Sequence, residues 1–132
     1  MQTIQEQSAI EKLIFSFSDA FNTADVQKTV ASFTPDGINM PNNAPPAKGT
    51  EQLTKAFEFL LNMAKINIEY HIDEVIVNGE YAFARTNSKV TTIFKANNDQ
   101  VILENKELFV LRQGNGEWKI SHYIFNNTKT TK

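Results

Sequence analysis

The first third of the chain carries apolar residues at helical spacing. A helix over residues 4–21 is predicted because apolar residues recur at intervals of three and four on one face: Ile10, Leu13, Ile14, Phe17 and Phe21. The polar stretch 22–25 ends this pattern. A second, shorter helix, N-capped by Thr23 or Asp25, is predicted by the apolar residues Val26, Val30 and Phe33.

Two less regular segments separate these helices from a third one. Thr34–Gly37 has the chemistry of a turn, and residues 38–40 are expected to form a brief strand. The following stretch 41–49 holds three of the four prolines, so we expect a loop that does not pair. A third helix, N-capped by Thr50, is predicted by an apolar face made of Leu53, Phe57, Leu60, Leu61 and Ala64.

From Ile66 onward the apolar period changes to two, which is typical of strands. The alternation changes phase at Asp73-Glu74, so we expect a bulge that bends this first long strand. Asn78-Gly79 predicts a type I′ hairpin turn, because both residues tolerate positive φ. Three more strands are predicted to follow: Tyr81–Phe94, Val101–Arg112 and Glu117–Asn127.

Helices first and strands afterwards are typical of the α+β class rather than of folds with alternating strands and helices. We expect one domain over residues 1–132. Strands this long should twist into a strongly curved antiparallel sheet, with the N-terminal helices packed on its concave side. Such an arrangement is expected to leave an apolar cavity at its open end.

Composition narrows the classes of function. The net charge is −2 and the basic residues are scattered, which argues against a nucleic-acid partner. The absence of cysteine excludes disulfides, thiolate metal sites and cysteine nucleophiles. No apolar run has the length of a membrane span and no leader-like segment opens the chain, so we expect no membrane partner and a cytoplasmic location. Glycine-rich phosphate loops and a Gly-x-Ser-x-Gly elbow are also missing.

Several short runs together resemble the nuclear transport factor 2-like superfamily: AFNTAD at 20–25, FTPDG at 33–37, KGTEQL at 48–53, YAFARTNS at 81–88, ENKELFVLR at 104–112 and GEWKISHYIFN at 116–126. The nearest resemblance is to its ketosteroid isomerase and SnoaL-like branch, in particular small SgcJ/EcaC-type proteins. The resemblance covers nearly the whole chain. It implies a cystatin-like half-cone and a homodimer formed through the sheet.

The same resemblance argues against steroid isomerase chemistry. Ketosteroid isomerases use a carboxylate base near the first strand and a tyrosine on the first helix as an oxyanion donor. Aligned on the matching runs, these positions fall at Met40 and Phe17, and neither side chain can exchange a proton. A fold shared with isomerases therefore does not give this chain their activity.

Strand register suggests a different acid/base pair. With Asn115-Gly116 as a two-residue turn, we expect Leu111 opposite Ile120, Phe109 opposite His122, Glu107 opposite Ile124 and Asn105 opposite Asn126. The opposite face would pair the cations Arg112 and Lys119, which belong in water. Glu107 and His122 would then be inward diagonal neighbours that can share a proton. The alternative is a structural role for both, and a slip of one residue would remove the pair.

The orientation of Arg85 stays open. Pointing inward, Arg85 would anchor a carboxylate or an enolate. If Ala82, Ala84, Thr86 and Ser88 form the inner face instead, Arg85 faces outward with Tyr81 and Phe83 towards a dimer partner. The pocket is expected to be lined by Phe17, Phe21, Phe33, Met40, Phe57, Arg85, Asn105, Phe109, Trp118 and Asn126.

No cofactor and no metal site are expected, because the only histidines, His71 and His122, lack a metal-binding spacing. Two main hypotheses of function remain. The first is a dimeric binding module that encloses an apolar small molecule without chemistry. The second is an isomerase, cyclase or dehydratase that transfers a proton next to a carbonyl through Glu107 and His122. An assembly domain without ligand is a third possibility on this scaffold.

Overall fold

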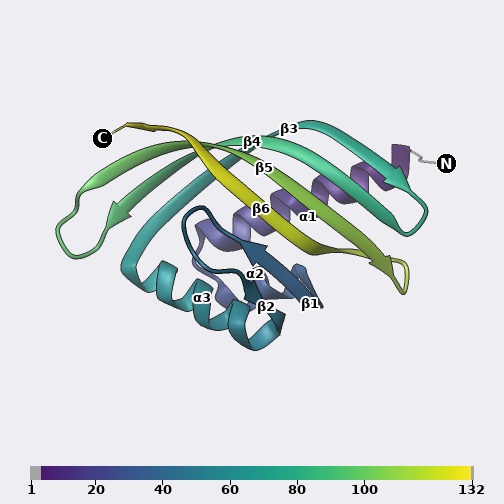
Figure 1. Ribbon diagram of the computed structural model, residues 1–132, viewed down its shortest axis with the longest axis horizontal. Coiled ribbons are helices and arrows are strands. Elements are labelled where there is room, and N and C mark those ends of the chain that lie inside the picture. The colour runs from purple at the N-terminus through teal and green to yellow at the C-terminus, as the bar shows by residue number, and fades with distance from the viewer. Residues whose placement is uncertain (1–3, 132) are drawn as a thin grey trace.

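A computed structural model describes residues 4–131 as three helices and six strands (Figure 1). The chain begins with α1 and α2 and continues through β1, β2 and α3 into four long strands. The bounds are α1 Ile4–Asn22, α2 Val26–Ala31, β1 Phe33–Met40, β2 Ala47–Lys48, α3 Gly49–Met63, β3 Ala64–Asn78, β4 Tyr81–Phe94, β5 Gln100–Gly114 and β6 Glu117–Thr131. This order confirms the predicted α+β class.

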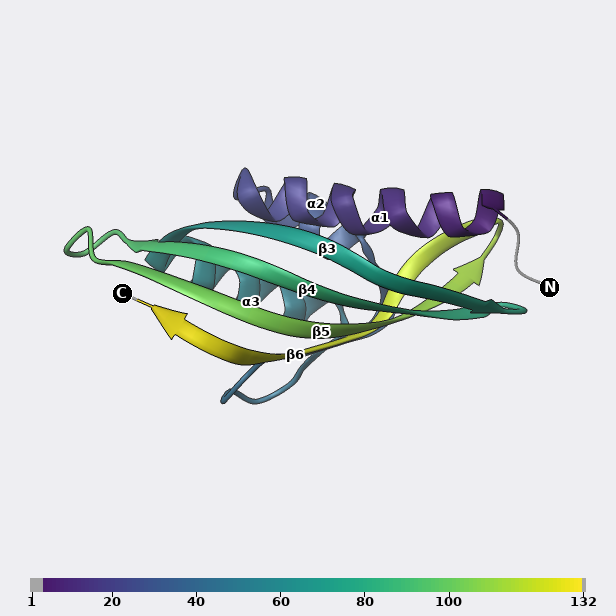
Figure 2. The same ribbon diagram turned by 90° about the horizontal axis from the view of Figure 1, so that it is seen from above.

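All strands belong to one sheet in the order β2-β1-β6-β5-β4-β3. Neighbouring strands are antiparallel except β1 and β6, which are parallel. The sheet arches over the helices, and the view from above shows α1 lying along one of its faces (Figures 1 and 2). We call this helix-covered face the inner face and the other the outer face. The predicted curved half-cone is thus confirmed, with one parallel pair added.

The α1 helix joins the inner face through apolar and polar contacts. Its residues Ile10, Ile14 and Phe17 are at most 2% exposed. At its C-terminal end, the Asn22 side chain donates to the carbonyl oxygen of Ile68 at 3.0 Å and accepts from the Ile68 N–H at 2.7 Å. Because β3 is an edge strand, this amide occupies backbone groups that would otherwise be free to pair with another chain.

Several predicted boundaries are corrected by the structure. Phe33 does not end the second helix but begins β1, and Thr34–Gly37 lies within the bounds of that strand as a segment without register partners, between Phe33 opposite Ile120 and Ile38 opposite His122. A Cβ at Gly37 would lie 2.9 Å from the Cβ of Phe33, so the chain passes itself closely there. The predicted loop also contains β2, which pairs with β1. The N-cap of α2 is Asp25, one of the two predicted candidates.

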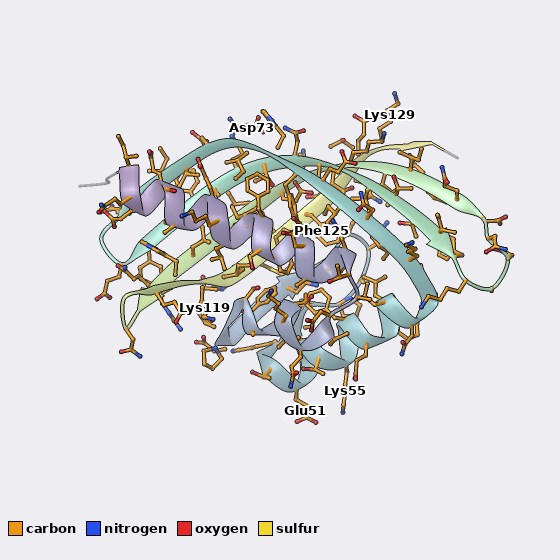
Figure 3. The ribbon with its side chains drawn as sticks, turned by 180° about the vertical axis from the view of Figure 1, so that it is seen from behind. Glu51, Lys55, Asp73, Lys119, Phe125 and Lys129 are labelled. Carbon is orange, nitrogen blue, oxygen red and sulfur yellow. The ribbon has the colours of Figure 1, made fainter. Side chains whose placement is uncertain are left out.

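The third helix begins earlier than predicted, at Gly49 with Lys48 as its N-cap residue, so Thr50 lies inside it. The side chain of Gln52 accepts from the Lys48 N–H at 2.9 Å and replaces a conventional capping side chain. On the outer side of the helix, Glu51 and Lys55 form an exposed ion pair of 3.3 Å (Figure 3). The apolar face with Leu53, Phe57 and Leu61 is buried as predicted.

The hairpin from β3 to β4 has the predicted position but a different turn. Asn78 pairs with Tyr81, so the turn residues are Gly79 and Glu80, and of these Gly79 has φ +65°. A positive φ at the first turn position alone corresponds to type II′ rather than the expected type I′. The predicted bulge in β3 is confirmed, because the register shifts between Ile72 and Glu74 and leaves Asp73 without a partner residue.

A second bulge, in β6, was not predicted. Leu111 pairs with Ile120 and Arg112 with Lys119, as expected, but Val110 pairs with His122. Ser121 is the extra residue, and its hydroxyl donates to the carbonyl oxygen of Val110 at 3.0 Å. An inserted residue reverses the side-chain alternation beyond it. The remaining register predictions are therefore wrong.

Candidate functional site

The bulge at Ser121 decides which residues of β6 face inward. Tyr123 is 4% exposed and lies opposite Phe109, whereas His122 is exposed on the outer face. Glu107 lies opposite Phe125 rather than Ile124. The predicted pairing of Glu107 with His122 is therefore wrong, because the two side chains extend from opposite faces of the sheet.

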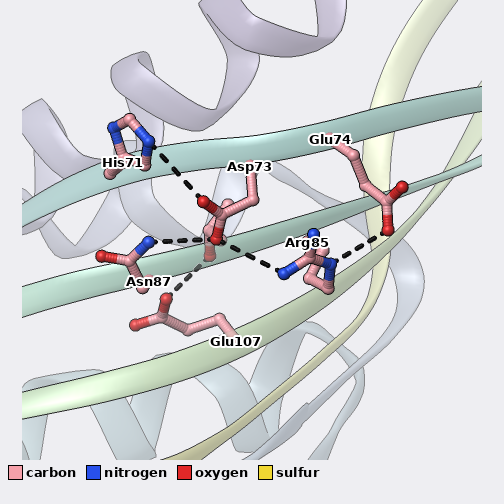
Figure 4. Close-up of polar contacts among 7 residues, drawn as sticks. His71, Asp73, Glu74, Arg85, Asn87 and Glu107 are labelled. Carbon is pink, nitrogen blue, oxygen red and sulfur yellow. Dashed lines mark hydrogen bonds and ion pairs between the residues drawn. The ribbon is translucent and has the colours of Figure 1, made fainter.

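Glu107 itself is buried on the inner face, where it is 4% exposed. Register places Thr86 directly opposite it on β4 and Ser88 one alternation further along that strand. The Thr86 hydroxyl donates to Oε1 of Glu107 at 2.7 Å, and the Ser88 hydroxyl donates to Oε2. Both carboxyl oxygens are thus hydrogen-bonded from one neighbouring strand, and Figure 4 shows one of these two bonds at Glu107.

The surroundings of Glu107 favour its neutral form. Burial raises the pKa of the Glu107 carboxyl, and the negative charge of Asp73 acts in the same direction. The hydrogen bonds from Ser88 and Thr86 oppose this increase because they stabilise the carboxylate, but burial has the larger effect on the pKa. A buried carboxyl with a raised pKa can hold a proton closer to neutral pH than an exposed one.

Two tyrosines meet beside this carboxyl. The hydroxyl oxygens of Tyr70, on β3, and Tyr123, on β6, lie 2.5 Å apart. Burial is the main cause that raises the pKa of each tyrosine well above its usual range, and the nearby Glu107 charge raises both further. Both phenols therefore stay protonated and can act as hydrogen-bond donors.

Two buried amides complete the polar part of the inner face. Asn105 is 5% exposed and Asn39 is 7% exposed. Among the residues that the structure describes, neither Oδ1 atom has a hydrogen-bond partner. Asn105 lies opposite Ser88, and Asn39 lies beside Tyr123 across the parallel β1–β6 pair. Unsatisfied buried acceptors are uncommon in folded proteins and suggest a site that another molecule can complete.

Aromatic rings surround this polar group. Phe17 is central, because its ring centroid lies within 6.5 Å of those of Phe21, Phe33, Phe57, Tyr70, Phe109 and Tyr123. Phe125, labelled in Figure 3, is half-buried. It stands opposite Glu107, and its ring centroid lies 5.6 Å from that of Tyr123. The inner face is therefore a closely packed aromatic interior, and Phe125 marks where it reaches the surface beside Glu107.

Surface hollows lie away from this polar group. One of about 580 Å³ opens between α2 and α3, with Val30, Phe33, Thr54 and Glu58 among its lining residues. Another of about 310 Å³ lies at the turn between β4 and β5. Of the predicted pocket residues, Phe33 alone borders one of these hollows.

The predicted pocket residues fall into two groups. Seven are buried or half-buried in the aromatic interior or beside it: Phe17, Phe21, Phe33, Phe57, Asn105, Phe109 and Trp118. The other three point elsewhere. Met40 shares the outer face with Ile124, Asn126 is exposed opposite Lys106, and Arg85 is exposed as well. The bulge in β6 accounts for Asn126, and strand alternation accounts for Met40 and Arg85.

The structure decides between the two orientations of Arg85 in favour of the outward one. Its Nε donates to Glu74 at 3.0 Å and its Nη1 lies 3.7 Å from Asp73 (Figure 4). Asn87 donates to the same Asp73 carboxylate at 3.0 Å, and His71 lies 3.6 Å from it. This cluster gathers at the β3 bulge on the outer face. Within residues 4–131, the histidines and acidic residues include no group of three or more with the geometry of a metal site.

Sequence reasoning missed the tyrosine pair and Asn39. The predicted register turns His122 inward and would leave Tyr123 on the outer face, because it contains no bulge at Ser121. The signal that could have revealed it is the pattern after Ser121, where Tyr123 and Phe125 alternate with His122 and Ile124. No helix in the described part of the chain is long and apolar enough to cross a membrane.

Comparison with solved structures supports the same fold. A ketosteroid isomerase-like protein from Erwinia carotovora atroseptica is 27% identical, with a TM-score of 0.90 over 96% of this chain and 99% of the other. A domain with a cystatin-like fold from Nostoc punctiforme has a TM-score of 0.78 at 17% identity, over 97% and 80% of the two chains. A type 2 hexachlorocyclohexane dehydrochlorinase has a TM-score of 0.88 at 12% identity, over 97% and 88%.

Sequence families give the more specific assignment. No curated protein sequence matches the chain. The model of the SnoaL-like domain family matches residues 15–120, which include all three helices in whole or in part and most of the sheet. The chain therefore belongs to the SnoaL-like domain family, within the nuclear transport factor 2-like superfamily.

Proposed function

We propose that this protein binds a small, mostly apolar molecule on the inner face of its sheet, with Glu107 and the Tyr70–Tyr123 pair contacting the polar end of that molecule. The observation that carries the proposal is the buried Glu107 carboxyl beside the paired hydroxyls of buried Tyr123 and half-buried Tyr70, in an aromatic interior. Buried polar groups converging inside an apolar site are typical of places where a ligand is oriented.

The ligand enters, in this proposal, beside Phe125. This ring is half-buried and lies on the strand that pairs with β5 at Glu107. The Phe125 ring contacts the Tyr123 ring, and rotation of the Phe125 side chain opens a path to the carboxyl. A ligand oxygen then accepts a hydrogen bond from a tyrosine hydroxyl, which replaces the mutual bond of the two phenols.

A second candidate function is proton transfer next to a carbonyl group. The raised pKa of Glu107 favours it, because a carboxyl that exchanges its proton nearer to neutral pH is a better general acid and base. In this reaction the Glu107 carboxylate removes a proton from the carbon next to the carbonyl. A tyrosine hydroxyl donates a hydrogen bond to the oxyanion that develops, and Glu107 returns the proton to another carbon of the substrate. His122 takes no part.

The family offers general support for both candidates. The related structures include a ketosteroid isomerase-like protein and an enzyme named for the cyclic, apolar compound hexachlorocyclohexane. Their sequence identity with this chain is 27% and 12%, so the shared feature is the fold and not a set of site residues. A cyclic apolar molecule with one polar group suits the aromatic interior described above.

Native mass spectrometry of the protein taken directly from its expression host tests the binding proposal. A bound small molecule is expected in the wild type and is expected to be reduced in Glu107→Gln, which cannot ionise. Glu11→Gln is the matched control, because Glu11 is exposed on α1. A second measurement is NMR titration with small cyclic ketones, in which the Glu107 and Ser88 amide signals should shift. Absence of a co-purified molecule together with unchanged spectra would reject binding on this face.

Turnover separates the two candidates. If Glu107 transfers protons, Glu107→Gln should lower the rate with a cyclic enone or ketone by about 10²–10⁴. His122→Ala should leave the rate unchanged, since this side chain is on the outer face. Binding without any turnover in the wild type favours the binding module.

We also propose that two copies associate through the outer face of the sheet. This face exposes large apolar residues on neighbouring strands, namely Ile76, Tyr81, Phe83, Leu108 and Ile124, each at least 38% exposed. Register connects them, because Ile76 lies opposite Phe83 and Leu108 opposite Ile124. Several exposed large apolar residues on neighbouring strands favour a protein partner. A second copy fits because the family resemblance implies a homodimer.

A further inference from the structure

Asn105 is the more buried of the two amide side chains, Asn39 and Asn105, whose oxygen has no hydrogen-bond partner among the described residues of the inner face. It is 5% exposed, and its Oδ1 atom has no hydrogen-bond partner among the described residues. A buried amide oxygen without a partner destabilises the folded chain, because the oxygen loses its water without a replacement. A buried polar side chain that lowers the stability of the free protein is therefore a candidate for a group that binds a ligand.

The neighbours of Asn105 explain why its oxygen has no partner. Ser88 lies directly opposite on β4, but its hydroxyl donates to Glu107. Thr86, one alternation away, also donates its proton to Glu107. A hydroxyl has a single proton, so neither side chain can supply another one to Asn105 while it holds the carboxyl. The carboxyl and the amide oxygen thus compete for the same donors, and the carboxyl takes both.

We infer that Asn105 is a specificity-determining residue that accepts a hydrogen bond from an O–H or N–H group of the ligand. This inference rests on the proposed binding function and adds a requirement to it. A purely apolar ligand would leave Oδ1 of Asn105 unsatisfied in the complex. A ligand with a donor at that point satisfies it and is preferred by the strength of one buried hydrogen bond.

The tyrosine pair sets the second requirement. Tyr70 and Tyr123 have two hydroxyl protons and use one of them in their mutual hydrogen bond, so one proton is left for an acceptor. The inner face therefore offers a donor at the tyrosines and an acceptor at Asn105, on either side of Glu107. The complementary ligand is a hydroxylated cyclic carbonyl compound, with its carbonyl oxygen at the tyrosines and its hydroxyl group at Asn105.

Tetralone and its hydroxylated isomers test this inference. They share one bicyclic body with a ketone and differ by a single hydroxyl group. We expect at least one hydroxytetralone isomer to bind the wild type about tenfold more tightly than tetralone, as one added buried hydrogen bond allows. The methyl ether of the same isomer should lose this advantage, because it has no proton to donate. Affinity is measured by NMR titration of the full chain.

The variant Asn105→Leu identifies the group responsible. It should bind tetralone as the wild type does and lose the preference for the hydroxytetralone isomer. Without ligand it should melt at the same temperature as the wild type or higher, because Leu removes an unsatisfied oxygen at similar size. Asn67→Leu is the matched control, since Asn67 is exposed on β3, and it should change neither the preference nor the inner site.

The possible results separate the inference from the proposal beneath it. If tetralone and every hydroxytetralone bind the wild type equally, or if Asn105→Leu keeps the preference, Asn105 is not the selecting residue and the inference is overturned while binding stands. If no tetralone shifts the inner-face amides of the wild type, the proposed binding function fails and the inference fails with it. If Asn105→Leu does not fold, Asn105→Ser tests the same loss, because its shorter side chain moves the oxygen away from the ligand.

Discussion

The hydroxyl oxygens of Tyr70 and Tyr123 lie 2.5 Å apart, although 53 positions separate these residues in the chain. Tyr70 is on β3 and Tyr123 on β6, and two strands, β4 and β5, lie between them in the sheet. In a flat sheet, strands three places apart are about 14 Å from one another. Two inward tyrosines therefore meet because the sheet is strongly curved, and their contact spans the inner face beside Glu107.

A double-mutant cycle measures this contact. We expect Tyr70→Phe and Tyr123→Phe each to lower the free energy of unfolding by about 1–2 kcal/mol, because each leaves a buried hydroxyl without its partner. The double variant should lose less than the sum of the two, with a coupling of about 1 kcal/mol. Urea unfolding measures all four proteins. Strict additivity would show that the two hydroxyls do not interact in solution.

The stability of the protein should depend on the ionisation of Glu107. Burial raises its pKa in the folded state above that of the unfolded chain, so the unfolded chain releases this proton first as the pH rises. The protonated Glu107 side chain contributes fully to stability at a pH below the ordinary pKa of a glutamic acid. This contribution is lost as the pH rises from that ordinary pKa to the raised pKa of the folded state. Glu107→Gln should remove this loss. Its unfolding free energy, minus that of the wild type, should therefore increase with pH across this window in urea titrations.

Glu11→Gln controls for the loss of one carboxyl from the chain. Glu11 is exposed on α1, so its replacement should leave the pH dependence of unfolding close to that of the wild type. A Glu107→Gln profile parallel to that of the wild type would contradict a raised pKa at this position.

Deletion of Ser121 should be strongly destabilising. Ser121 is the extra residue of the β6 bulge, and without it every later side chain in the strand changes face. Tyr123 would then leave the interior and His122 would enter it, a change that should lower the unfolding free energy by more than about 3 kcal/mol. Ser121→Ala keeps the bulge and loses one hydrogen bond to Val110, so about 1 kcal/mol is expected. Similar losses in the two variants would refute the importance of the bulge.

Asn22→Ala should leave the backbone of Ile68, on the edge strand β3, without its side-chain hydrogen bonds. The Asn22 amide both donates to and accepts from the backbone of Ile68, and the variant loses both hydrogen bonds. We expect a loss of about 1–3 kcal/mol in unfolding free energy and faster hydrogen exchange at the Ile68 N–H. Asn67→Ala, an exposed change on the same strand, serves as the control. Unchanged exchange at Ile68 in Asn22→Ala would mean that the contact does not protect this edge.

The proposed homodimer predicts a specific sensitivity to charge. Phe83→Glu places a carboxylate in the apolar outer face and should shift the protein from dimer to monomer in analytical ultracentrifugation. Phe59→Glu is the matched control, because Phe59 is 70% exposed on α3 and lies away from the sheet. A wild type that sediments as a monomer at micromolar concentration, or two variants that behave alike, would refute association through this face.

The periodicity of apolar residues was sufficient to predict most of the secondary structure. Helical spacing up to residue 64 and alternation afterwards predicted three helices and four long strands, because the side chains of each element are buried on one face. The change of phase at Asp73 also revealed the first bulge, since it shifts apolar residues from one set of alternate positions to the other. The loop over 41–49 was less clear, because β2 pairs for two residues only and leaves no pattern.

The candidate site depended on features that local sequence does not contain. Glu107 was singled out correctly as an inward carboxyl, since it alternates with Phe109 and Leu111 on β5. Its assigned partner was wrong, because the bulge at Ser121 interrupts β6 without a glycine or proline to announce it. The orientation of Arg85 was equally undetermined, since alternating small and large residues on β4 fit either face until the neighbouring strands are placed.

By itself, the amino-acid sequence determined the class of fold, the order of the elements and the residues that share a face within each element, because these follow from the geometry of a single helix or strand. Only the tertiary structure decided which residues meet across the sheet. The Tyr70–Tyr123 contact needs the curvature of four strands together, and the exclusion of His122 needs the register between two of them. Both depend on the relative placement of separate strands, which no single strand's pattern contains.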